Sequence, residues 1–114
     1  MRPDTTVKEN YLFRRIYRKG ASAVEPCMVL YCQKNRRGMT RLGVTVSTKL
    51  GKAVVRNHAR RQMRELWRTH KDEMTPGYDV IIVVRSRATR TPYRELERQY
   101  LHALQKLSLR ETVS

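Results

Sequence analysis

Residues 49–68 read KLGKAVVRNHARRQMRELWR and combine two patterns on one predicted helix. At about 100° per residue, an apolar stripe suited to a core is formed by Val55, Ala59, Met63, Leu66 and Trp67. The neighbouring arc of about 140° carries Arg56, Asn57, Arg60, Arg61, Arg64 and Arg68. Lys49 and Lys52 precede this arc, and Glu65 is the one acid of the stretch. The pattern predicts a helix that packs by one face and presents cations on the next.

The charge of this helix points to a polyanionic partner. Arginine forks match phosphate oxygens in geometry as well as in charge. The whole chain has 25 Lys and Arg against 10 Asp and Glu, a formal net charge of +15. Such an excess repels itself in a compact protein and is typical of nucleic-acid binding. A solvated surface is the alternative, but solvated helix faces usually mix both signs of charge.

The sequence argues against a membrane partner and for the cytoplasm. No apolar run approaches the roughly 20 residues of a membrane-spanning helix, and residues 1–10 lack the apolar stretch of a signal peptide. Cys27 and Cys32 fall within one predicted strand, on opposite faces, so they should not pair. We therefore expect a cytoplasmic protein with reduced thiols.

At 114 residues the chain is expected to form a single domain, residues 1–114. Along the chain the patterns predict a helix over 6–19, a strand over 27–33, its hairpin partner over 41–47, the basic helix, a buried strand over 78–84 and a final helix. The final helix is expected to have Thr91 as N-cap and Pro92 at its first position. Its buried stripe would be Leu96, Tyr100, Ala103 and Leu107. This order predicts an α+β sandwich around a small mixed sheet.

No catalytic or metal-binding pattern stands out in the sequence. The histidines, His58, His70 and His102, are scattered and lack metal-ligand spacing with either cysteine. Pairing with nearby arginines explains the acids better than acid–base catalysis does. If the protein serves an enzyme, we expect the chemistry to lie in another component.

Aromatic residues near the N-terminus allow two interpretations. Phe13 and Tyr17 are four residues apart on the first predicted helix and are flanked by arginines, while Tyr31 shares a strand face with Val29. Such residues often belong to a core. Aromatic rings interleaved with arginine also suit a groove for single-stranded nucleic acid, in which the rings stack on bases. The residues alone leave both interpretations open.

With these residues in view, the chain resembles the protein subunit of bacterial ribonuclease P. Three stretches carry the resemblance: residues 13–20 (FRRIYRKG), 47–66 (STKLGKAVVRNHARRQMREL) and 77–85 (GYDVIIVVR). His58 stands where an arginine is frequent in the family, and Ala59 where a larger residue is common. The resemblance implies an αβββαβα fold, like the second domain of a ribosomal protein, with a left-handed crossover around the basic helix. The additional strand is expected within residues 41–47 or their flanks.

The resemblance also implies a function. In that family a large RNA is the catalyst and uses Mg²⁺ to release the 5′ leader of precursor tRNA, with one protein assisting each RNA. The residues expected to contact the catalytic RNA are Lys49, Lys52, Arg56, Asn57, Arg60, Arg61, Arg64 and Arg68. The residues expected to line a cleft for the 5′ leader are Phe13, Tyr17, Val29 and Tyr31. No catalytic residue or metal ligand is expected in the protein itself.

Two other classes of protein share some of these features. A basic ribosomal protein or general RNA chaperone would account for the charge and the arginine-rich helix, but it gives no reason for an aromatic cleft. A basic nuclease acting alone would need an acid–base pair or a metal-ligand set, which the sequence does not offer. Copurification with one abundant non-ribosomal RNA, rather than with ribosomal subunits, would separate the first class from the family assignment.

Overall fold

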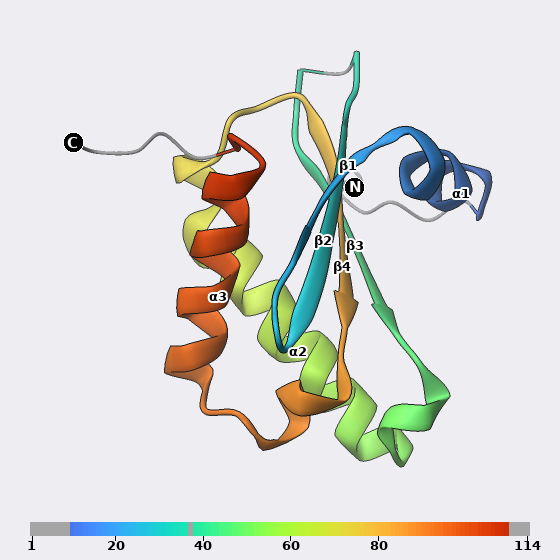
Figure 1. The fold of residues 1–114 in the computed structure, drawn as a ribbon, viewed down its shortest axis with the longest axis vertical. Helices are drawn as coiled ribbons and strands as arrows, with labels where there is room; N and C mark the ends of the chain where they lie inside the picture. Colours follow the sequence, from blue (N-terminus) through green and yellow to red (C-terminus); the bar gives the residue numbers. More distant parts are fainter. Residues whose placement is uncertain (1–9, 37, 110–114) are drawn as a thin grey trace, which may run out of the picture.

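The computed structural model describes residues 10–36 and 38–109, with the side chains of the first helix described from residue 14 onward. In this part of the chain, three α-helices surround a twisted four-stranded sheet (Figure 1). The elements are α1 (Asn10–Lys19), β1 (Ala21–Val24), β2 (Met28–Lys34), β3 (Arg41–Val46), η1 (Thr48–Leu50), α2 (Ala53–His70), η2 (Lys71–Glu73), β4 (Tyr78–Val84), η3 (Ser86–Arg90) and α3 (Tyr93–Lys106). The order αβββαβα and the α+β class agree with the prediction.

The sheet has the strand order β1-β2-β4-β3 and is mixed. β2 runs antiparallel to both β1 and β4, whereas β3 runs parallel to β4. A crossover through α2 joins these two parallel strands, which end level with each other at Val46 and Val84. The segments that follow β3 and β4 therefore leave the sheet at the same end.

Two strand predictions are wrong. β3 is not the hairpin partner of β2, because β4 lies between them. The sequence of β4 is almost continuously apolar, and a central place buries both of its faces. The additional strand is β1, outside the expected region of residues 41–47 and their flanks. Of its four residues only Ala23 is buried, so β1 lacks the alternating pattern that would have revealed it.

The two faces of the sheet pack against different helices. Alternate residues of the strands, together with α2 and α3, form the main core, which includes Leu30, Val80 and Ile82. The opposite face carries α1, where Ile16 packs against Ile81 in a smaller cluster that includes Tyr31 and Val83 at its margin. In Figure 1, α1 lies on one side of the sheet and α2 and α3 on the other.

The long helices follow their predicted patterns with small shifts. On α2, Ala59, Met63 and Leu66 are buried as predicted and Trp67 is half-buried. Val55 is 37% exposed, contrary to its place in the predicted stripe. The reason is that α2 begins beyond the ends of the strands, so its first turn has no sheet to cover it (Figure 1).

α3 buries Leu96, Tyr100 and Ala103 as predicted, while Leu107 is half-buried just past the end of the helix. The N-cap residue is Pro92 rather than Thr91. The Thr91 hydroxyl instead donates a hydrogen bond to the carbonyl of Arg87, at 2.7 Å. The predicted cap residue therefore stabilises the η3 segment and not the helix.

The first helix was expected to start near residue 6, and residues 6–9 lie outside the described part of the chain. α1 ends at Lys19, directly before Gly20 as predicted. Both cysteines are buried free thiols, as expected. They do not lie on opposite faces, because Cys27 precedes β2 and shares the main core with Cys32. No helix in the described ranges is long and apolar enough to cross a membrane.

Candidate nucleic-acid interface

A row of basic and amide side chains runs along the exposed side of α2. We call it the α2 row, and its members are Arg56, Asn57, Arg60, Arg61, Arg64 and Arg68. All of these residues are exposed except Arg56 and Arg60, which are partly covered. Five of them, from Asn57 to Arg68, line one open hollow together with Glu65. The structure therefore brings the predicted arc together on one surface.

Hydrogen bonds within the α2 row order some of its side chains and leave others free. Arg68 pairs with Glu65 through two hydrogen bonds of 3.1 and 2.5 Å, and these bonds hold the pKa of Glu65 below its usual value. Arg60 donates to the Asn57 amide oxygen at 3.0 Å. Arg61 and Arg64 have no polar partner among the described residues. The row thus keeps an uncompensated positive charge, with two guanidinium groups open to a ligand.

Two lysines extend this charge beyond the start of the helix. Lys49 belongs to η1, where its backbone N–H donates to the Ser47 hydroxyl at 3.1 Å, and its side chain is exposed. Lys52 is the N-cap residue of α2 and makes no side-chain capping bond. Arg56 donates to the Gly51 carbonyl at 3.2 Å, which ties the first turn of α2 back to this segment.

The second candidate surface lies on the other face of the sheet, beside α1. The rings of Tyr17 and Tyr31 meet edge to face, with centroids 4.8 Å apart and planes at 79°. The Tyr17 hydroxyl lies 3.3 Å from the Thr45 hydroxyl oxygen, and the Tyr17 side chain is 39% exposed. Val29 is half-buried on the same strand face as Tyr31. We call this the aromatic cleft.

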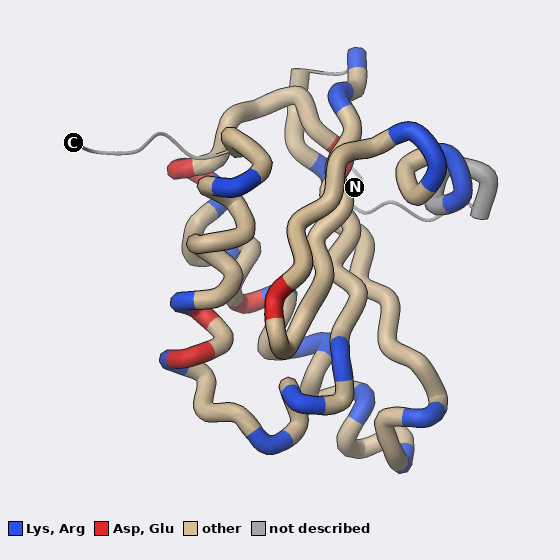
Figure 2. Tube along the Cα trace, in the orientation of Figure 1, with Lys and Arg blue, Asp and Glu red and all other residues tan. Residues whose placement is uncertain are grey.

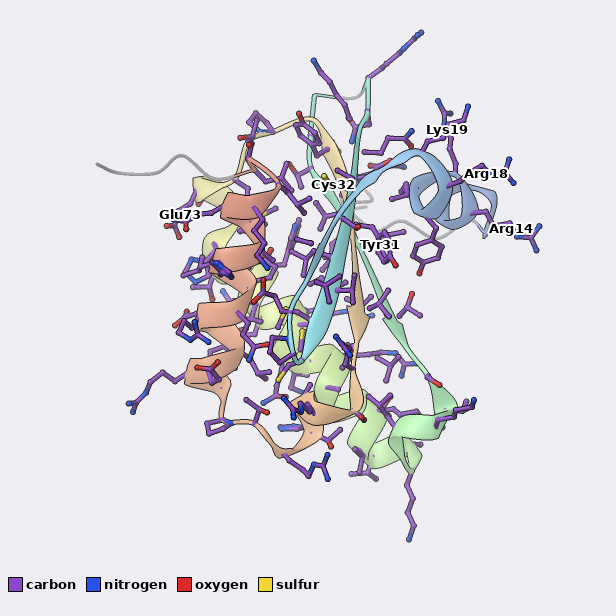
Figure 3. All side chains as sticks on the ribbon, viewed as in Figure 1. Arg14, Arg18, Lys19, Tyr31, Cys32 and Glu73 are labelled. Carbon is purple, nitrogen blue, oxygen red and sulfur yellow. The ribbon has the colours of Figure 1, made fainter. Side chains whose placement is uncertain are left out.

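Phe13 belongs to α1, but its side chain lies outside the described residues. Arg14 and Arg18 project from the side of α1 that faces away from the sheet, while Tyr31 points toward α1 (Figure 3). Arg14 and Arg18, which flank the aromatic residues in the sequence, therefore point away from the cleft.

Thr45 and Val83 belong to the cleft and were missed in the sequence. Thr45 lies in register with Val83, and Val83 with Val29, so all three side chains share one sheet face. A correct strand order would have been enough to find them, because side chains alternate between the two faces of a sheet. The incorrectly predicted hairpin between β2 and β3 left out β4, so it could not place Thr45, Val83 and Val29 on one face.

Several ionisable side chains away from these surfaces pair with one another. His70 contacts Glu73 and Glu97, and His102 lies 3.1 Å from Glu25. His58 is exposed on α2. Within residues 10–36 and 38–109 no three His, Cys, Asp or Glu side chains are grouped so that they could hold a metal ion. The acids pair with histidine as well as with the arginines that the sequence suggested.

A cationic helix on one side of a small sheet and an aromatic pair on the other are typical of a small α+β protein that binds nucleic acid. A family model described as Ribonuclease P matches residues 1–108. The ribonuclease P protein component of Clostridium botulinum is 36% identical over 107 residues, which cover 93% of this chain and 96% of that protein.

Solved structures agree with this sequence similarity. The Staphylococcus aureus RNase P protein superposes with a TM-score of 0.87 at 32% identity, over 96% of this chain and 100% of that chain. The Thermotoga maritima RNase P protein superposes with a TM-score of 0.80 at 27% identity, over 92% and 97% of the two chains. The chain belongs to the ribonuclease P protein family. This membership implies a role in tRNA processing and an RNA subunit as partner.

Proposed function

We propose that this protein binds the catalytic RNA of ribonuclease P and the 5′ leader of precursor tRNA at two separate surfaces. The α2 row, with Lys49 and Lys52, contacts phosphates of the catalytic RNA. The aromatic cleft, with Tyr17, Val29 and Tyr31 and with Phe13 from α1, holds the leader. One protein acts with each RNA, in the cytoplasm, and the RNA performs the hydrolysis.

The observation that carries this proposal is the placement of the two surfaces on opposite faces of one sheet. β2 and β4 contribute one set of side chains to the core that supports α2 and the alternate set to the aromatic cleft. A rigid sheet between two binding surfaces can hold two RNA segments at a fixed separation. Positioning of this kind lowers the barrier of a reaction without a catalytic side chain.

The cationic surface acts by reducing repulsion between two polyanions. Catalytic RNA and precursor tRNA repel each other through their phosphates, and Arg61 and Arg64 are free to form charge-assisted hydrogen bonds with phosphate oxygens. The described residues do not fit a metal site, since they offer no grouped set of ligands. In this proposal the RNA holds the Mg²⁺ of the reaction.

Reconstitution tests the proposal. Purified protein, a bacterial ribonuclease P RNA and precursor tRNA are combined at low Mg²⁺ concentration, and release of the 5′ leader is measured. We expect cleavage that neither the protein nor the RNA alone supports under these conditions. Absence of stimulation, together with tight binding to ribosomal RNA, would contradict the proposal and favour a ribosomal protein.

A further inference from the structure

A second group of cations lies at the carboxyl ends of β3 and β4. We call it the end cluster, and it consists of Lys49, Lys52, Arg87 and Arg90. We propose that Arg87 and Arg90, which belong to no motif of the sequence, join the two lysines and extend the phosphate-binding surface for RNA beyond the α2 row. This surface would hold phosphates that the α2 row does not reach. The inference rests on the proposed function, because it takes a structured RNA as the partner.

The topology places these residues at one end of the molecule. β3 and β4 are parallel and end in register at Val46 and Val84, so η1 and η3 follow directly from neighbouring strand ends. η3 packs against both η1 and α2. Figure 2 shows basic segments along this lower end of the protein and no acidic ones among the residues it describes. Segments about 40 positions apart in the sequence thus form one surface.

The backbone of η3, which carries the two arginines, is held in place by packing and hydrogen bonds. Ala88 is only 2% exposed and lies in the main core, so it anchors the segment. The Thr89 hydroxyl donates to the Ser86 carbonyl at 2.8 Å, and the Thr91 hydroxyl donates to the Arg87 carbonyl at 2.7 Å. Arg87 and Arg90, on either side of the anchor, are exposed. A backbone ordered in this way reduces the entropy lost when the two side chains bind a ligand.

The positive charge of the end cluster is not compensated within the described part of the chain. None of its four side chains pairs with a described carboxylate. The acids of the neighbouring elements are already engaged: Glu25 lies 2.7 Å from the Lys106 ammonium, and Glu95 pairs with Arg98 at 2.6 Å. Four cations gathered without a counter-charge destabilise a compact protein unless a polyanion binds them.

Salt-dependent binding to a bacterial ribonuclease P RNA tests the inference. For the double variant Arg87→Ala/Arg90→Ala we expect Kd to rise roughly tenfold near physiological salt. The slope of log Kd against log salt concentration should become shallower by about 1.4 to 1.8, the value for two lost phosphate contacts. Footprinting should show lost protection at one RNA segment while the remaining protected segments persist. The double lysine variant Arg87→Lys/Arg90→Lys should retain most of the slope.

The matched control removes the same charge from the opposite end of the sheet, with Lys34→Ala/Arg36→Ala. An equal change of slope in this control would show that net charge rather than position matters, and it would overturn the inference. An unchanged slope in the Arg87/Arg90 alanine variant would also overturn the inference. The proposed function would still stand in that case, provided that the wild-type protein binds the RNA with a steep dependence on salt concentration. Failure of the wild-type protein to bind the RNA would overturn both.

Discussion

Arg41 and Asp79 lie opposite each other on the parallel strands β3 and β4 and are joined by two hydrogen bonds of 2.7 Å, from Nε to Oδ1 and from Nη2 to Oδ2. Both side chains are almost fully buried. Asn35 also donates to Asp79 Oδ1, at 2.8 Å. Because a buried charge that loses its partner is costly, this pair fixes the start of β3 beside the start of β4.

Asp79→Ala should therefore lower the free energy of unfolding by about 3–5 kcal/mol, since it leaves the Arg41 guanidinium buried without its carboxylate. Urea denaturation measures this change. Asp72→Ala provides the control, because Asp72 is an exposed acid of η2, and its loss should alter stability by no more than about 0.5 kcal/mol. Equal effects of the two substitutions would show that the ion pair does not fix the strands.

Tyr31→Leu should weaken the use of precursor tRNA without disturbing the protein. Leucine keeps apolar contact with Ile81 and Ile16 but removes the ring that meets Tyr17. Stacking on one base is worth about 1–3 kcal/mol, so the KM for precursor should rise at least about fivefold. Binding of mature tRNA, which lacks the leader, serves as the control and should stay unchanged. Equal losses for both tRNAs, or failure to fold, would place Tyr31 in the core rather than in a binding surface.

Glu65→Gln should strengthen binding to a bacterial ribonuclease P RNA. Glu65 is the one acid in the hollow of the α2 row, and it holds Arg68 in an internal pair. Its removal frees that guanidinium for phosphate, and the expected gain in affinity is up to about fivefold at low salt. Glu95→Gln is the matched control, because it releases Arg98 from an equivalent pair on α3. If the control produced the same gain, the effect would come from net charge alone.

His70 should make stability depend on pH. Its ring is 12% exposed and contacts Glu97 and Glu73, near the Tyr100 ring. Burial acts to lower the pKa of His70, but the hydrogen bonds to the two carboxylates outweigh burial and raise the pKa above its unfolded value of about 6.5. The folded protein therefore binds the proton more tightly than the unfolded chain does.

The stabilisation from His70 is fully present below the unfolded pKa and is lost as the pH rises through the folded pKa. The free energy of unfolding should thus fall from pH 5.5 to pH 8.5 more in the wild-type protein than in His70→Gln. Urea denaturation at the two pH values measures the difference. Parallel pH profiles for the two proteins would rule out the contribution of His70.

Much of the fold could be predicted because several segments carry strong local patterns. The apolar stripe around Met63 located α2, the near-continuous run at residues 78–84 located a strand buried on both faces, and Gly20 ended α1. β1 was missed because only Ala23 is buried in it. These local patterns could not predict the strand order either, because it depends on contacts between segments that are distant in the sequence.

The candidate site, too, could be predicted from the sequence only in part. Helical periodicity was sufficient to bring Arg60, Arg61 and Arg64 onto one surface, because their spacing along the helix fixes their direction. The pairing of Arg68 with Glu65 could be found only from side-chain positions in the structure. The full set of residues in the aromatic cleft could be found only from the register between Thr45 and Val83 on two neighbouring strands. Contacts between distant segments follow from the whole sheet, and a single segment does not encode them.

The position of β4 late in the sequence has a consequence for how the protein folds while it is being synthesised. β4 is the only described strand that pairs with both β2 and β3, yet it lies at residues 78–84. Until it is synthesised, β2 and β3 have no common neighbour, and α2 has no completed sheet on which to pack. Such non-local pairing slows folding, because the intervening loop must close first. The α2 row and the aromatic cleft thus gain their supporting sheet together, late in synthesis, so a nascent chain that stops before β4 carries the basic residues without the sheet that positions them.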